Sequence, residues 1–132
     1  MKTQFSQVQQ FNHEILGIAP RAKGPQPIEE AQLSHRQLTE EANEYLQAIK
    51  DGDYIGAIDG CIDSIIFAMG ILYKLGVRED QFDSIFEVVM SANMSKKIGV
   101  KKGREGFDAV DAIKPEGWVP PEETIAKILA DD

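Results

Sequence analysis

The hydrophobic pattern is strongest between residues 54 and 73, where the chain reads YIGAIDGCIDSIIFAMGILY. Nearly every position is apolar or small, which is typical of a helix buried on all sides. Asp59 and Asp63 are exceptions, and because they are four residues apart they lie on one face of the helix. Two carboxylates in an apolar setting require a compensating cation such as a metal ion. The alternative is that they face solvent through a gap in the core.

Apolar residues also recur at helical spacing in other parts of the chain. They predict helices over residues 3–16, 28–50 and 79–97, and a short last helix that opens at Pro120 and Pro121. The sequence Asp51-Gly52-Asp53 suits the end of one helix and the cap of the next. We therefore expect helices 28–50 and 54–73 to form an antiparallel hairpin, with the second helix ending at Leu75-Gly76.

Two segments lack a helical period. Residues 17–27 carry three prolines and two glycines and are interpreted as a connecting arm. Residues 98–120 are rich in lysine, glycine and proline, and no alternation typical of a strand is found anywhere in the chain. The predicted fold is one all-α domain over residues 1–132. Its core is a four-helix bundle, with a short N-terminal helix, a long basic loop and a C-terminal helix.

Composition narrows the possible functions. The net charge of -8 argues against a general nucleic-acid binder, whose surface would be basic. The single cysteine, Cys61, lies in the apolar helix, so we expect it in the core of a cytoplasmic protein. Residues 54–73 are just long enough to span a bilayer, but Asp59 and Asp63 near their middle argue against a membrane partner. The N-terminus shows no secretory signal.

A second group of acids lies on helix 28–50, at Glu40, Glu41 and Glu44. These residues form either an ordinary solvated face or, through the hairpin, one cluster with Asp59 and Asp63. Such a cluster of five carboxylates would demand cations. Ligation by oxygen alone favours Mg²⁺ or Mn²⁺ over zinc. A di-iron site is not expected, because the chain has no Glu-x-x-His pair.

Basic residues concentrate between positions 96 and 104, in an otherwise acidic chain. The cluster consists of Lys96, Lys97, Lys101, Lys102 and Arg104. It is either a solvated loop or a site for the phosphates that complete the coordination of magnesium. Asn93 falls on the apolar stripe of helix 79–97, so we expect it to point inward, where a ligand is one possible partner.

These motifs occur in a characteristic order. Glu-Glu-x-x-Glu at residues 40–44 is followed by Asp63, by SANMSKK at residues 91–97 and by KPEGWVPP at residues 114–121. The set resembles the MazG-like all-α nucleoside triphosphate pyrophosphohydrolases, and most closely their short phage-type members, over about residues 5–129. The resemblance implies metal-dependent hydrolysis between the α and β phosphorus, which gives a nucleoside monophosphate and pyrophosphate.

The resemblance also implies roles for individual residues. Magnesium or manganese ligands are Glu40, Glu41, Glu44, Asp59 and Asp63; Glu40 or Glu41 is the catalytic base; and the substrate-binding residues are Asn93, Lys96, Lys97, Lys101 and Trp118. Trp118 either stacks on the substrate or fills the core. Members typically carry an acid three residues before the last aspartate, where this chain has Gly60, so the role of Asp59 is less direct.

The resemblance leaves the substrate and the assembly open. It favours a purine deoxynucleotide as the substrate, with dGTP first, because some phage-type relatives lower the concentration of dGTP in the cell. A broad-specificity housecleaning enzyme and a non-enzymatic, metal-binding helical interaction protein are the alternatives. Relatives form homodimers or homotetramers, and a phage-encoded member would work in the host cytoplasm.

Overall fold

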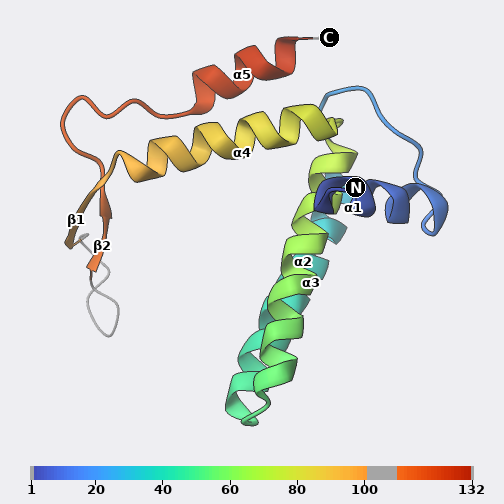
Figure 1. Ribbon diagram of the computed structural model, residues 1–132. Helices are drawn as coiled ribbons and strands as arrows, with labels where there is room; N and C mark the ends of the chain where they lie inside the picture. Colours follow the sequence, from blue (N-terminus) through green and yellow to red (C-terminus); the bar gives the residue numbers. More distant parts are fainter. Residues whose placement is uncertain (1, 101–109, 132) are drawn as a thin grey trace. The chain divides into compact units, whose positions relative to one another are not determined.

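The computed structural model describes residues 2–100 and 110–131 (Figure 1). Within them it contains five helices and one two-stranded sheet. The elements are α1 (Gln4–Glu14), α2 (Ile28–Lys50), α3 (Tyr54–Lys74), α4 (Glu79–Met94), β1 (Lys97–Val100), β2 (Val110–Ile113) and α5 (Glu122–Ala130). The predicted all-α class is confirmed. The chain falls into two compact units, residues 1–79 and 80–132, while a four-helix bundle that includes α4 stays a prediction.

The first unit is built around the predicted hairpin of α2 and α3, which lie side by side (Figure 1). Its turn uses Gly52, whose φ of 70° lies in the left-handed region that favours glycine. Asp53 then caps α3, because its Oδ1 accepts a 2.9 Å hydrogen bond from the backbone N–H of Gly56. The turn chemistry therefore sets which faces of the two helices meet.

Gly60 lets the two helices approach closely. It is buried, and a Cβ built at this position would lie 3.1 Å from the backbone nitrogen of Tyr45 on α2. That separation is tighter than ordinary side-chain contact, so glycine suits this position for steric reasons. The close approach brings the acidic part of α2 level with the aspartates of α3.

The arm between α1 and α2 is held by specific hydrogen bonds. Arg21 donates to both carboxylate oxygens of Glu30, at 2.6 and 2.8 Å. The hydroxyl of Tyr73 donates to the carbonyl of Ile18 at 2.6 Å. At the end of α3, Gly76 has a φ of 81°, which confirms the predicted glycine stop. These contacts fasten the arm to α2 and α3.

The second unit contains an element that the sequence pattern did not predict. Strands β1 and β2 pair antiparallel, from Lys97 opposite Ile113 to Val100 opposite Val110. The expectation of no strands was therefore wrong, and α4 ends at Met94 rather than at residue 97. Each strand has only four residues, too few to show a clear alternation.

The environment of α3 also differs from the prediction. Its buried residues are Ala57, Gly60, Gly70 and Tyr73, and Cys61 is exposed rather than part of the core. Exposed apolar residues on α3 include Tyr54, Ile55, Ile58, Ile62, Ile65 and Ile66. The reason is that α2 and α1 cover only part of the helix surface within the first unit. By length and composition α3 could cross a membrane, a weak indication because core helices of soluble proteins share these properties.

Candidate active site

Glu41 is the centre of the acidic cluster. Its side chain is half-buried, and its Oε2 atom is buried without a hydrogen-bond partner in the described residues. Burial raises the pKa of Glu41, and the carboxylates of Glu44, Asp63 and Asp59 raise it further. The hairpin therefore brings four of the five predicted acids within electrostatic reach of one another. Glu40 is exposed, and its role stays a prediction.

The donor types of this cluster fit a hard cation. All four side chains offer carboxylate oxygens, which Mg²⁺ and Mn²⁺ prefer, and the unpartnered Oε2 of Glu41 is a group that a cation would satisfy. Among the described residues, no group of three or more histidine, cysteine, aspartate or glutamate side chains is arranged so that it could hold a metal ion. The arrangement thus supplies the right ligands without a closed coordination shell.

Asp59 lies one residue before Gly60, the position at which the resemblance implies an acid. A side chain at position 60 would start 3.1 Å from the backbone of Tyr45, facing α2. Asp59 is exposed, yet its carboxylate is among the groups that raise the pKa of Glu41. The shift from position 60 to position 59 is therefore compatible with the close packing of α2 and α3.

The predicted substrate-binding residues belong to the second unit. Lys97 is exposed at the start of β1, and Asn93 is also exposed, so its predicted inward orientation was wrong for this chain. Lys101 lies outside the described residues. Lys96 is half-buried, with its ammonium nitrogen 5.1 Å from the ring centroid of Trp118. The substrate-binding roles of these residues stay predictions.

Trp118 has a clear structural role. Its indole nitrogen donates a 2.8 Å hydrogen bond to the carbonyl of Ala92 at the end of α4. Lys114 lies 5.2 Å from the ring centroid, in addition to Lys96. These contacts fasten the segment before α5 to the end of α4, although Trp118 is half-buried and not part of the core. A stacking role toward substrate stays a prediction.

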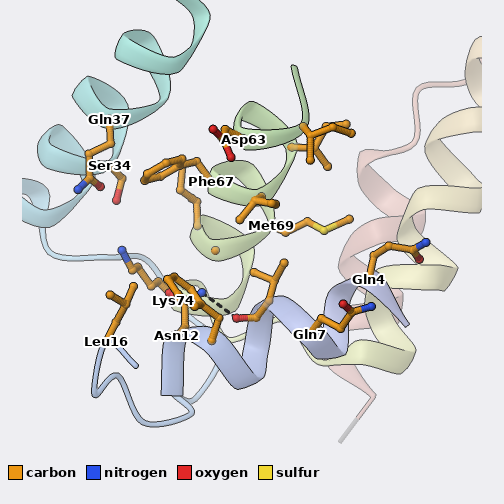
Figure 2. A pocket seen from close by; sticks show the side chains of 17 residues that line it. Gln4, Gln7, Asn12, Leu16, Ser34, Gln37, Asp63, Phe67, Met69 and Lys74 are labelled. Carbon is orange, nitrogen blue, oxygen red and sulfur yellow. Dashed lines mark hydrogen bonds between the residues drawn. The ribbon is translucent and has the colours of Figure 1, made fainter. Parts of the chain in front are cut away.

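A groove beside the acids was not predicted from the sequence. It has a volume of about 770 Å³, is lined by α1, α2 and α3, and includes Asp63 in its wall (Figure 2). Most of its lining is apolar, and the polar groups besides Asp63 are those of Gln4, Gln7, Asn12, Ser34, Gln37 and Lys74. Its residues come from three separate segments of the chain, so no local motif marks it. The spacing of Gln37 and Glu41, four residues apart on α2, was the available signal.

Comparison with known families agrees with this geometry. A family model described as phosphoribosyl-ATP pyrophosphohydrolase matches residues 8–93, which is more than half of the chain and includes all five predicted acids. No curated protein matched the chain. The MazG-like resemblance is thereby confirmed at the level of the superfamily, whereas a phage-type specificity stays a prediction. The chain belongs to the phosphoribosyl-ATP pyrophosphohydrolase family, within the MazG-like all-α nucleoside triphosphate pyrophosphohydrolase superfamily.

Proposed function

We propose that the protein is a divalent-metal-dependent hydrolase that cuts a nucleoside triphosphate between the α and β phosphorus. The products are a nucleoside monophosphate and pyrophosphate. Pyrophosphohydrolase activity follows from the family, and the arrangement around Glu41 is the single observation that carries the finer proposal. A buried carboxylate oxygen without a partner, close to three more acids, is unfavourable unless a cation joins it.

The protein side of the mechanism divides between the two helices. Bound Mg²⁺ or Mn²⁺ would neutralise phosphate charge and lower the pKa of a water nucleophile. Oε2 of Glu41 would hold the cation together with the carboxylates of Glu44, Asp63 and Asp59. Glu41 is a better proton acceptor than Glu40, because its carboxyl is half-buried beside the other acids whereas Glu40 is exposed.

Outside the acidic cluster, we assign substrate contacts from the charge and the hydrogen-bonding groups of each side chain. Lys96, Lys97 and Lys101 would donate to phosphate oxygens, where negative charge develops during displacement. Asn93 is exposed, and its amide would hydrogen-bond to the sugar or base. Trp118 would contact the substrate only by stacking, because its indole N–H already donates to the carbonyl of Ala92.

One experiment tests the reaction and its metal requirement. The purified chain is incubated with each ribo- and deoxyribonucleoside triphosphate and with phosphoribosyl-ATP, in Mg²⁺, Mn²⁺, Zn²⁺ or excess chelator. We expect monophosphate and pyrophosphate, detected by anion exchange, with Mg²⁺ or Mn²⁺ and little turnover with zinc or chelator. Diphosphate with orthophosphate, or undiminished turnover in chelator, would contradict the proposal. A complete lack of turnover would favour a non-enzymatic metal-binding protein.

The same screen separates the candidate substrates. The sequence resemblance favours dGTP, whereas the family name points to phosphoribosyl-ATP. A site that hydrogen-bonds the guanine edge should prefer dGTP over dATP by well over about tenfold, because wrong bases leave buried polar groups unpaired. Similar kcat/KM values for all four deoxynucleotides would identify a broad-specificity housecleaning enzyme instead.

We also propose that the working form is a homodimer or homotetramer. Exposed apolar side chains gather near the turn that joins α2 and α3. They are Tyr45, Leu46, Ile49, Tyr54, Ile55 and Ile58. A monomer seldom leaves so much apolar surface in contact with water, and a second copy of the chain would cover it. We expect this assembly in the cytoplasm, without a nucleic-acid or membrane partner.

A further inference from the structure

The groove of the first unit begins at the acidic cluster. Asp63 belongs both to the groove wall and to the carboxylates that raise the pKa of Glu41. Gln37 also lines the groove, and it precedes Glu41 by four residues on α2. Residues four apart on a helix lie on the same face, about 6 Å from each other. The groove therefore lies one helical turn from the group that we assign to proton transfer.

The lining of the groove has the composition of a small-molecule site. Its apolar part includes Phe11, Ile66, Phe67 and Met69, and its volume of about 770 Å³ lies within the range of roughly 300–1,000 Å³ usual for ligand pockets. Figure 2 shows Phe67 and Met69 on α3, below Asp63. A flat, weakly polar group such as a nucleobase can pack against such a wall.

Four amide side chains line the groove, those of Gln4, Gln7, Asn12 and Gln37 (Figure 2). Two of them, Asn12 and Gln37, differ in their availability. Asn12 is buried, and its Nδ2 donates a 2.9 Å hydrogen bond to the carbonyl of Val8. Gln37 is half-buried, and its side chain makes no hydrogen bond within residues 2–100 and 110–131. An amide has two donors and an acceptor, so the Gln37 side chain can pair with the polar edge of a base.

We propose that the groove between α1, α2 and α3 is the nucleoside subsite of the hydrolase. The base packs on the apolar wall around Phe67, and the Gln37 amide hydrogen-bonds to its polar edge. This inference rests on the proposed function, since it places the phosphates at the acids next to Asp63. It assigns base recognition to the first unit, in addition to the role expected for Asn93.

Filling the groove tests the subsite. The variant Ile66→Trp places a large ring on the wall, and Leu33→Trp is its control, because Leu33 is similarly exposed on α2 but does not line the groove. We expect Ile66→Trp to weaken binding of a non-hydrolysable α,β-methylene deoxynucleotide by about tenfold or more. The affinity for inorganic tripolyphosphate, which has no base, should change less than about twofold. Leu33→Trp should leave both affinities unchanged. Binding is measured by titration calorimetry with Mg²⁺.

The amide is tested separately with Gln37→Met, which keeps the length of the side chain and removes its hydrogen-bonding groups. Its control is Gln32→Met, on an exposed part of α2 outside the groove. We expect Gln37→Met to reduce the preference among bases while the affinity for tripolyphosphate stays the same. Unchanged base preference with both Gln37→Met and Ile66→Trp would overturn the proposal.

The measurements separate the subsite from the reaction and from assembly. A wild-type chain that binds the analogue in the groove but forms no pyrophosphate would refute the proposed function and leave the subsite standing. A chain that hydrolyses nucleotides, with binding unaffected by Ile66→Trp, would refute the subsite alone. Equal losses for the analogue and tripolyphosphate, a lower melting temperature, or an altered mass in light scattering for Ile66→Trp would mean that the groove serves folding or contact between copies, and would also overturn the proposal.

Discussion

At the scale of single residues, Glu41 shows a conflict between stability and function. Its carboxyl is partly removed from water, close to like charges, and one oxygen lacks a hydrogen bond in the described residues. Such an arrangement costs free energy in the metal-free protein, and groups with perturbed pKa values concentrate at functional sites. Glu41 is therefore the residue at which a substitution best separates catalysis from folding.

We expect Glu41→Gln to lower kcat by at least about a hundredfold, because the amide accepts no proton and carries no charge for a cation. In metal-free buffer its melting temperature should equal or exceed that of the wild type. Because burial and neighbouring acids raise the folded-state pKa of Glu41, the wild type loses stability as pH rises from the unfolded pKa, about 4.3, through the folded pKa. Thermal melts with chelator between pH 4 and 8 measure this difference. A large loss of melting temperature in Glu41→Gln would instead assign Glu41 a structural role.

The ion pair of the arm has the opposite pH dependence. Two hydrogen bonds from Arg21, with one from Gln26, lower the pKa of Glu30 to about 2. Because the folded-state pKa is depressed, the pair stabilises the fold above about pH 4.3, and this contribution is lost as pH falls toward 2. We expect Arg21→Gln to cost about 1 kcal/mol at pH 7, the upper range for a partly exposed pair. Urea unfolding should show a smaller difference at pH 2.5, and an equal difference at both pH values would contradict this account.

At the scale of elements, the sequence predicted the helices well, because each carries an apolar period and a recognisable end. Gly52 and Asp53 specify the turn of the hairpin, and that turn suffices to bring Glu41 and Asp63 together. The strands β1 and β2 were missed, because each has only four residues, too few to show a clear alternation. The groove was missed for a different reason, since residues from three separate segments line it.

Periodicity also gave the wrong environment for α3. An all-round apolar helix is expected to be buried, but the pattern does not say what covers it. Within its own unit, α3 leaves Ile55 and Ile58 exposed. The same limit explains Asn93, whose place on an apolar stripe suggested burial although it is exposed.

Two glycines of α3 allow a matched test of helix packing. A Cβ at Gly60 would lie 3.1 Å from a backbone nitrogen of α2, whereas one at Gly70 would lie 3.4 Å from the side chain of Asn12. Alanine improves helix propensity by about 1 kcal/mol at either site. We expect overpacking to outweigh this gain in Gly60→Ala, with a net loss of about 1 kcal/mol, and Gly70→Ala to be neutral or stabilising. Urea unfolding of both variants measures the contrast, and an equal gain in both would show that α2 and α3 are not closely packed at Gly60.

At the scale of the whole molecule, charge and apolar surface have different consequences. The net charge of -8 makes copies of the chain repel one another, but it does not cover the apolar residues near the turn of the hairpin. Association of like-charged copies is therefore expected only if the buried apolar area outweighs their repulsion. This balance predicts that salt, which screens the repulsion, strengthens assembly.

We expect the wild-type chain to show a mass of two or four times 14.7 kDa in size-exclusion chromatography with light scattering at micromolar concentration. Ile55→Glu should shift the chain toward the monomer mass, because burying an unpaired carboxylate in an apolar contact costs several kcal/mol. Ile28→Glu is the control: Ile28 is 70% exposed and Ile55 72% exposed, but Ile28 begins α2 and lies far along the helix from the turn. A wild-type chain with the mass of a monomer would contradict the proposed assembly. Equal dissociation of both variants would show that the added charge, and not the surface near the turn, controls association.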